Sequence, residues 1–167
     1  GRIILMKAVQ INAYGGVEVL EVKENVPVPT PGTKQVPVEV HAAGLNPVDR
    51  SIREGRFKDL APSAFPITMG GDFSGVVRQV GDGVTDFKVG DEVYGSATSI
   101  LNRGSGSYAE MAVVDTNYCA LRPANTSFKE AAALVLTGVS AVQALEEHIK
   151  LTSGSRILIH GGAGGIG

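Results

Sequence analysis

Short valine-rich stretches separated by glycine and proline make up most of the chain and restrict the folds open to it. Between Met6 and about Leu121 they are KAVQI, LEVKENV, VPVEVHAAG, GVVRQVG, DEVYG, YAEMAVV and YCALR. In residues 36–42 every second residue is apolar, so one face of that strand is expected in a core. The intervening segments PVPTPG, GDGVTDFKVGD and NRGSGS carry turn-forming residues. Many short strands joined by turns predict a β-barrel in preference to a sandwich.

A helix is expected to begin after Ser127, where the composition changes. Glu130 follows Ser127 at the capping-box spacing of a helix N-terminus, and alanine-rich sequence continues to about Lys150. The turn LTSGS then leads into RILIH, residues 156–160, which is apolar on both faces as in a strand of a parallel sheet. The sequence therefore predicts a β domain over residues 6–126 and the opening of an α/β domain over residues 127–167.

The composition excludes several classes of partner and site. A net charge of -2 over 167 residues, without runs of like charge, gives no basis for binding nucleic acid or an anionic membrane. Cys119 is the only cysteine, which excludes an internal disulfide and fits a cytoplasmic protein. Residues 131–145 are too few for a membrane span and are expected to form a buried helix in a soluble protein. The first five residues, GRIIL, are interpreted as a tag remnant before a native Met6.

A glycine loop follows the expected strand at residues 156–160. Gly162, Gly164 and Gly167 have the G-x-G-x-x-G spacing that lets a turn close tightly and the backbone approach a pyrophosphate. The loop residues expected to bind a dinucleotide are Gly162, Ala163, Gly164, Gly165, Ile166 and Gly167. The helix and the acidic residue that complete such a site would lie beyond Gly167, so we expect the chain to be a fragment of a longer protein.

Several stretches together resemble the N-terminal half of a medium-chain dehydrogenase/reductase of the zinc-independent quinone oxidoreductase branch. They are AAGLNPVDRSIREG, FPITMGGDFSGVVRQVGDGVTDFKVGDEVYG, GSYAEMAVV, AAALVLTGVSAVQAL and ILIHGGAGGIG. The resemblance implies a mainly β GroES-like barrel followed by the start of a truncated Rossmann domain. It further implies NADP or NAD as cofactor, with NADP favoured, and a cytoplasmic homo-oligomer when full-length.

The resemblance also predicts that no zinc is bound. Zinc-dependent members of the superfamily place a cysteine after an A-x-G turn and a histidine in a Gly-His-Glu segment, whereas this chain has Asn46 in AAGLN and Gly71 in GGD. Zinc needs three good protein donors in such a site, and an amide and a glycine do not supply them. Without a Lewis acid to stabilise an alkoxide, we expect hydride addition to a quinone or an α,β-unsaturated carbonyl.

Asn46 and Asp49 are the candidate catalytic residues. The resemblance places Asn46 beside the nicotinamide, where its amide would bond the ribose or a substrate oxygen. Alternatively, Asn46 only caps a short helix that begins at Pro47. Asp49, one helical turn later, would hold a basic partner near the cleft or would serve the same cap.

Other residues are assigned through the resemblance, each with a structural alternative. Phe57 and Tyr94 are expected at the substrate pocket, although packing would also account for Tyr94; Ser51 and Phe57 stand where many relatives carry tyrosines. Thr137 and Ser140, in LTGVSA, are expected beside the phosphates and nicotinamide ribose of the cofactor. A hydroxyl in a helix can also bond the carbonyls of its own helix. His41, His148 and His160 match no role in the resemblance and are expected to be structural, as is Cys119. Tyr108, like Tyr94, would touch the cleft or would only pack, and packing is the preferred interpretation.

Two hypotheses of function follow. In the first, the chain is the N-terminal half of an NAD(P)H-dependent oxidoreductase that reduces quinones or α,β-unsaturated carbonyls without zinc, and the fragment alone is inactive. In the second, it is a non-catalytic GroES-like binding or scaffold module. A native mass near twice that of this chain would favour the enzyme.

Overall fold

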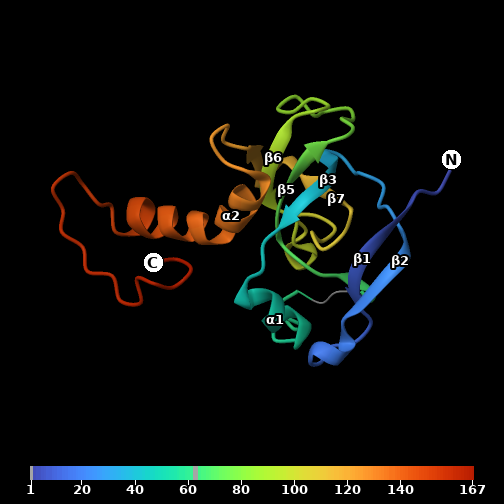
Figure 1. The fold of residues 1–167 in the computed structure, drawn as a ribbon, viewed down its shortest axis with the longest axis horizontal. Helices are drawn as coiled ribbons and strands as arrows, with labels where there is room; N and C mark the ends of the chain where they lie inside the picture. Colours follow the sequence, from blue (N-terminus) through green and yellow to red (C-terminus); the bar gives the residue numbers. More distant parts are fainter. Residues whose placement is uncertain (1, 62–63) are drawn as a thin grey trace.

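A computed structural model describes residues 2–61 and 64–167 (Figure 1). The strands are β1 Leu5–Ile11, β2 Glu21–Pro27, β3 Gln35–Ala43, β4 Ile67–Thr68, β5 Asp72–Val77, β6 Glu92–Ser96, β7 Met111–Asp115 and β8 Cys119–Leu121. The helices are α1 Pro47–Arg53 and α2 Phe128–Val142, which continues as a π-helical segment, Gln143–His148. Short 3-10 turns occupy Val17–Val19, Ser99–Leu101 and Thr116–Tyr118.

The strands form two antiparallel sheets that curl toward each other. The five-stranded sheet has the order β7-β3-β5-β6-β8 and the three-stranded sheet the order β2-β1-β4. Residues 108–110 link the two sheets, because the N–H of Val9 donates to the carbonyl of Tyr108 (2.8 Å) and the N–H of Val40 to that of Glu110 (2.9 Å). The predicted barrel is therefore confirmed as a curled half-barrel of antiparallel strands.

The main core lies against the five-stranded sheet. Its fully buried members are Val36, Val38, Phe73, Val77, Val93, Ala97, Ala112 and Val114. Val36 and Val38 confirm the alternation expected in this segment. Pro37, between these two valines, is buried as well, and the pairing of β3 with β5 shifts by one residue at a bulge between Val40 and Ala42.

Some strand boundaries differ from those expected. β5 begins at Asp72, earlier than the predicted GVVRQVG, and ends at Val77, where the chain turns away. We expected the fold to begin at Met6, but Leu5 already pairs with Pro27 in β1. The short strand β4 carries no strand pattern of its own and forms because Thr68 and Ile67 pair with β1.

Gly75, in the centre of β5, lies where the backbones of two strands approach closely. A Cβ atom at this position would overlap the backbone carbonyl of Glu39 in β3, and that carbonyl is fixed by the sheet. We expect Gly75→Ala to lower the free energy of unfolding by about 1–3 kcal/mol, measured by chemical denaturation. Gly81→Ala is the matched control, since a Cβ atom there meets nothing within 4 Å. Equal stability of the two variants would contradict this packing.

Helix α2 begins as predicted but is buried only in its first half. The hydroxyl of Ser127 accepts from the N–H of Glu130 (3.1 Å), and the N–H of Ser127 donates to the Glu130 carboxylate (3.0 Å), which confirms the capping box. Ala131, Ala132 and Val135 are the buried residues of the helix. The expectation of a buried helix is wrong for the remainder, where no described segment covers the apolar side chains.

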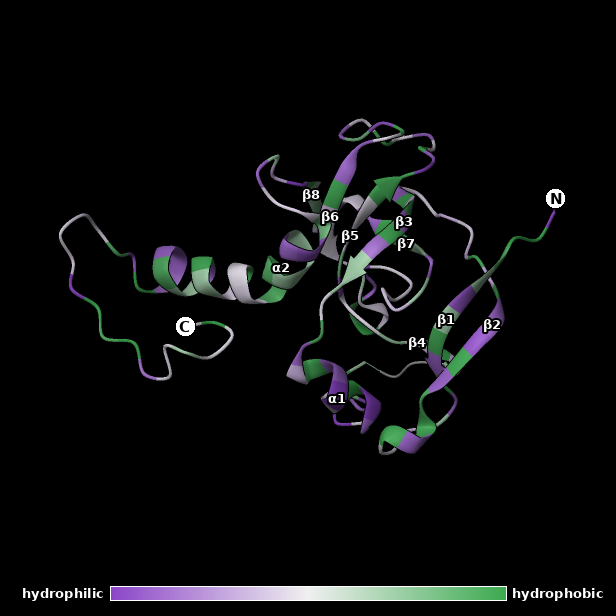
Figure 2. Ribbon diagram, in the orientation of Figure 1, coloured by the Kyte–Doolittle hydropathy of each residue, from purple (hydrophilic) through white to green (hydrophobic). Residues whose placement is uncertain are grey.

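The uncovered part of α2 is apolar. Figure 2 shows hydrophobic positions along its C-terminal half and along the segment that follows, both away from the sheets. Leu134, Leu136, Val139 and Val142 are exposed. By length and composition, Phe128–His148 is long and apolar enough to cross a membrane, but core helices of soluble proteins meet the same criterion, so this feature is weak evidence for a span.

Residues 156–160 do not form the expected strand. They have no regular secondary structure, and Leu158 is 81% exposed. A strand of a parallel sheet exists only when neighbouring strands satisfy its N–H and C=O groups. Within the described residues no strand pairs with this segment, so the strand prediction is wrong for this structure, although the apolar pattern that prompted it is present.

Candidate functional site

Asn46 lies at the N-terminus of helix α1. It is the N-cap residue, Pro47 follows at the first helical position, and Asp49 occupies the third. The backbone N–H of Asn46 donates to Oδ2 of Asp49 (2.8 Å). The side chain of Asn46 faces the backbone N–H of Asp49 in a capping-box arrangement, without a well-aligned hydrogen bond between them. The structure thus confirms that Asn46 and Asp49 cap this helix.

The side chain of Asn46 is also held from the five-stranded sheet. Its Nδ2 donates to Oδ2 of Asp72 (2.9 Å), the first residue of β5. The same oxygen accepts the backbone N–H of Leu136 in α2 (3.0 Å). Asp72 is only 4% exposed, so this carboxylate is a buried junction between α1, β5 and α2.

Tyr108 completes the cluster from the loop before β7. Its hydroxyl donates to Oδ2 of Asp49 (3.1 Å) and also lies 3.3 Å from the carbonyl oxygen of Gly44. The ring packs over Gly70, whose φ of +95° and lack of a side chain both suit glycine, since a Cβ atom would overlap that ring. We call Asn46, Asp49, Asp72 and Tyr108 the Asn46 cluster.

Burial shifts the titration of all three acidic members of the Asn46 cluster. Burial raises the pKa of Asp49, opposed by hydrogen bonds from Asn46 and Tyr108, and the nearby Asp72 carboxylate raises it further. Burial also raises the pKa of Asp72, opposed by hydrogen bonds from Leu136 and Asn46. The pKa of the Tyr108 phenol is raised, first by burial and then by Asp49, so the phenol is a hydrogen-bond donor at neutral pH.

The raised pKa of Asp72 predicts the sign of a pH effect on stability. A carboxyl with a raised pKa stabilises the fold below its unfolded pKa, and this contribution is lost as the pH rises through the folded pKa. Asp72→Asn keeps an acceptor oxygen and removes the titration. We therefore expect the variant to gain stability relative to the wild type as the pH rises from 3 to 7, measured by thermal denaturation. A difference that does not change with pH, or that changes in the opposite direction, would contradict this.

One expected cofactor residue of α2, Thr137, lies against one residue of the glycine loop, Gly165. Thr137 lies beside the loop, since a Cβ atom on Gly165 would stand 3.5 Å from Cγ2 of Thr137. The hydroxyl of Thr137 also bonds back to the carbonyl of Ala133 (3.4 Å), as the structural alternative proposed. Ser140 lies one turn further along α2 and is half-buried. All the residues of the glycine loop, 162–167, are exposed.

Neither of the two expected pocket residues makes a hydrogen bond to the Asn46 cluster that the structure records, although Phe57 shares an apolar cluster with the ring of Tyr108. Phe57 is half-buried and packs against Ile11, Ile52, Ile67 and Met69. Tyr94 pairs directly with Ser74, so it is on the sheet face that carries the bond from Ser74 to the carbonyl of Phe128 in α2.

A groove of about 800 Å³ lies between the three-stranded sheet and two loops. Neither Phe57 nor Tyr94 lines it. The lining combines apolar and uncharged polar side chains, among them Gln10, Ile67, Thr68, Ile100 and Leu101. A second, smaller hollow shares Ile67, Thr68 and Ile100 and reaches Gly70, under the ring of Tyr108.

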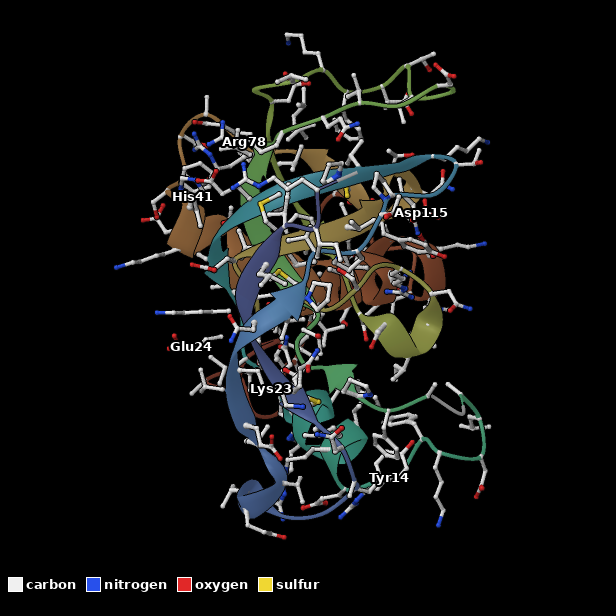
Figure 3. All side chains as sticks on the ribbon, turned by 90° about the vertical axis from the view of Figure 1, so that its right-hand side faces the viewer. Tyr14, Lys23, Glu24, His41, Arg78 and Asp115 are labelled. Atoms are coloured by element: carbon white, nitrogen blue, oxygen red, sulfur yellow. The ribbon has the colours of Figure 1, made fainter. Side chains whose placement is uncertain are left out.

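The histidines and the cysteine have structural surroundings. Glu39 joins His41 (3.3 Å) and Arg78 (2.8 Å), both visible on the five-stranded sheet in Figure 3, and the ring of His41 stacks on Phe128 at 4.4 Å. His148 and His160 are exposed.

Burial raises the pKa of Cys119 to about 12, and its thiol packs against the main core. Among residues 2–61 and 64–167, no three His, Cys, Asp or Glu side chains gather as metal ligands would.

Sequence reasoning missed two members of the Asn46 cluster. The sequence draws attention to Asp72 only within GGD, and for Tyr108 it favours packing over contact with the cleft. The tyrosine ring does pack in the core beside Ile11 and Met69, but its hydroxyl bonds Asp49. The signal for Asp72 in the sequence is an acidic residue directly before a short uncharged run, FSGVV, which ends in two valines.

Comparison with known proteins places the chain in a family. Residues 32–124 match the alcohol dehydrogenase GroES-like domain. The chain is 39% identical over 163 residues to the quinone oxidoreductase of Rattus norvegicus, covering 98% of this chain and 47% of that protein. It is 44% identical to 2-methylene-furan-3-one reductase of Solanum lycopersicum and 41% identical to the chloroplastic NADPH-dependent alkenal/one oxidoreductase of Arabidopsis thaliana, covering 97% of this chain and 42% of each protein.

Solved structures agree with these relatives. A mycobacterial quinone oxidoreductase superposes with a TM-score of 0.84 at 30% identity, covering 96% of this chain and 47% of that one. A mycobacterial protein solved in complex with NADPH superposes with a TM-score of 0.81 at 29% identity, covering 96% of this chain and 46% of that one. The chain belongs to the alcohol dehydrogenase GroES-like domain family, within the medium-chain dehydrogenase/reductase superfamily and with quinone oxidoreductases as homologues. It spans about half the length of the curated relatives it matches.

Proposed function

We propose that the chain is the N-terminal half of a cytoplasmic, NADPH-dependent oxidoreductase that reduces quinones or α,β-unsaturated carbonyls. The observation that carries this proposal is the Asn46 cluster, which holds a neutral amide in a rigid setting at the end of the GroES-like domain nearest α2. The names of the relatives support the substrate class, and NADP is favoured over NAD because one relative is named as NADPH-dependent and a structural neighbour was solved with NADPH.

The residues present fit a nicotinamide cofactor. Asn46 keeps one amide N–H that no described residue accepts, while its other polar groups face Asp72 and the helix terminus. Thr137 and the glycine loop already lie together, and Gly165 leaves the space between them free of a side chain. In this proposal Asn46 contacts the nicotinamide end, and Thr137, Ser140 and residues 162–167 contact the phosphates, with Rossmann-type backbone binding.

The chemistry assigned to this half of the protein is binding, polarisation and exclusion of water. NADPH, when bound, supplies a hydride. The amide of Asn46 supplies a hydrogen bond to an oxygen, and Asp49 and Tyr108 keep helix α1 and therefore Asn46 in place. We infer that zinc takes no part, because the positions of the expected cysteine and histidine ligands hold Asn46 and Gly71.

NADPH oxidation by the complete protein tests the proposal, with 1,4-benzoquinone and butenone as acceptors. We expect turnover with at least one of them and a preference for NADPH over NADH. No turnover with either acceptor, together with no binding of NADPH, would support the alternative of a GroES-like binding module.

A further inference from the structure

We propose that Asp72 is a positioning residue that fixes the amide of Asn46 and sets its distance from Thr137. This inference rests on the proposed function, because it concerns how the chain presents two cofactor contacts. It is carried by a single carboxylate oxygen, Oδ2 of Asp72, which accepts from Nδ2 of Asn46 (2.9 Å) and from the N–H of Leu136 (3.0 Å).

The first step concerns the orientation of the amide. The N–H of Leu136 is a backbone donor fixed in α2, so the atom that faces it must be an acceptor. Oδ2 of Asp72 remains an acceptor whether or not the carboxyl is protonated on Oδ1. Because that same oxygen faces Asn46, the Asn46 amide must turn its nitrogen toward Asp72. If the Asn46 amide were flipped, its Oδ1 would face Oδ2 of Asp72, and two acceptor oxygens would lie together at the buried end of β5.

The second step concerns what Asn46 then presents. With Nδ2 at Asp72 and the side chain facing the N–H of Asp49 in the capping box, the polar group left over is the second amide N–H. Among the described residues no acceptor takes this N–H. Asn46 is therefore presented as a hydrogen-bond donor, which suits an acceptor oxygen, either of the nicotinamide ribose or of a quinone or enone carbonyl.

The third step concerns helix α2. Leu136 directly precedes Thr137, so the bond from Leu136 to Asp72 fixes the backbone beside the proposed phosphate contact. The N–H of Gly44 also donates to the carbonyl of Asp72 (3.0 Å). A Cβ atom on Gly44 would stand 2.8 Å from the carbonyl of Ala132 and 3.0 Å from Cβ of Asp72, so the chain before Asn46 lies directly against α2. One buried side chain thus ties both proposed cofactor contacts to β5.

The test uses the complete protein carrying Asp72→Ala, Asp72→Asn, Asp72→Glu, Asn46→Ala and the double variant Asp72→Ala with Asn46→Ala. Dissociation constants for NADPH are measured by quenching of protein fluorescence or by calorimetry, and kcat and KM are measured separately for NADPH and the acceptor. Thermal midpoints are recorded for each. Asp82→Ala, which removes an exposed carboxylate, is the matched control.

Asp72→Ala and Asn46→Ala are each expected to weaken NADPH affinity or kcat/KM by about tenfold or more, since each takes away the hydrogen bond that the oriented Asn46 amide would donate to the cofactor or to the acceptor oxygen. The double variant is expected to lose no more affinity or kcat/KM than the more impaired of the two single variants, because the two residues act as one unit. Asp72→Asn keeps the acceptor and should stay within about threefold of the wild type. Asp72→Glu keeps the charge but moves the oxygen, so it should lose affinity even where Asp72→Ala does not fold. If only the affinity for NADPH falls, the ribose is the partner of Asn46. If only the KM for the acceptor rises, the partner is the acceptor carbonyl.

The inference is overturned if Asp72→Ala and Asp72→Glu lower only the thermal midpoint while NADPH binding and kcat stay at wild-type values, since Asp72 would then be purely structural. It is also overturned if Asp72→Asn is as impaired as Asp72→Ala, or if the two single effects add. A wild-type protein that neither binds nor oxidises NADPH would instead overturn the proposed function, and this inference with it.

Discussion

Phe73→Ala is expected to lower the free energy of unfolding by about 3–5 kcal/mol, the range for removing a buried aromatic side chain. Phe73 is fully buried in β5 and is the largest side chain with no exposed surface. It packs in the main core with Val38, Val77 and Val93. Its neighbours are strand residues whose backbones are held by the sheet, so they cannot move inward to fill the space. Chemical denaturation with circular dichroism measures the effect.

The control for this variant is Val22→Ala, which truncates a strand residue that is 72% exposed. We expect the control to change stability by less than about 0.5 kcal/mol. A Phe73→Ala protein as stable as the control would show that this sheet face does not form the core.

Asn46→Ala is expected to have two separable effects. The loss of the N-cap side chain should cost about 0.5 kcal/mol of stability, the low end of the N-cap range, because this side chain makes no well-aligned bond to the helix N–H groups. The loss of the amide beside the proposed cofactor should lower kcat/KM for NADPH oxidation by about 10- to 100-fold, the range for a hydrogen bond of about 1.5–3 kcal/mol to an acceptor oxygen that gains negative charge as the hydride is added. The buried Oδ2 of Asp72 would also lose one of its two donors, which adds to the cost in stability.

Asn125→Ala is the control for this pair of effects, because Asn125 lies exposed in the loop before α2. Its stability and its kcat/KM should both remain within the error of the wild-type values. If Asn46→Ala lost stability as expected but kept full kcat/KM, Asn46 would be a helix cap and nothing more. That result would remove the main support for the proposed function.

Local signals in the sequence predicted most of the fold. The capping box at Ser127 and Glu130 involves residues three apart, so its side chains can be placed without knowing the tertiary structure. The alternation of Val36 and Val38 likewise reports one buried face of one strand. In both cases the signal and the structure it specifies lie within a few residues of each other.

Contacts between distant residues could not be predicted in this way. The bond from Asn46 to Asp72 joins residues 26 apart, and the bond from Asp72 to Leu136 joins residues 64 apart. Tyr108 reaches Asp49 across 59 residues. The apolar pattern of residues 156–160 was recognised, but a parallel strand depends on neighbours that no local pattern supplies. The site therefore became visible only when β5, α1 and α2 were seen together.

The most direct test of the account is NADPH oxidation by the complete wild-type protein, assayed with and without a chelator. The quinone or enone that gives turnover is used as acceptor, and Asn46→Ala is assayed in parallel. We predict that wild-type turnover is unchanged by the chelator and that Asn46→Ala loses about 10- to 100-fold of kcat/KM in both conditions. Turnover abolished by the chelator and restored by zinc would contradict the interpretation of Asn46 and Gly71 as the residues that replace metal ligands.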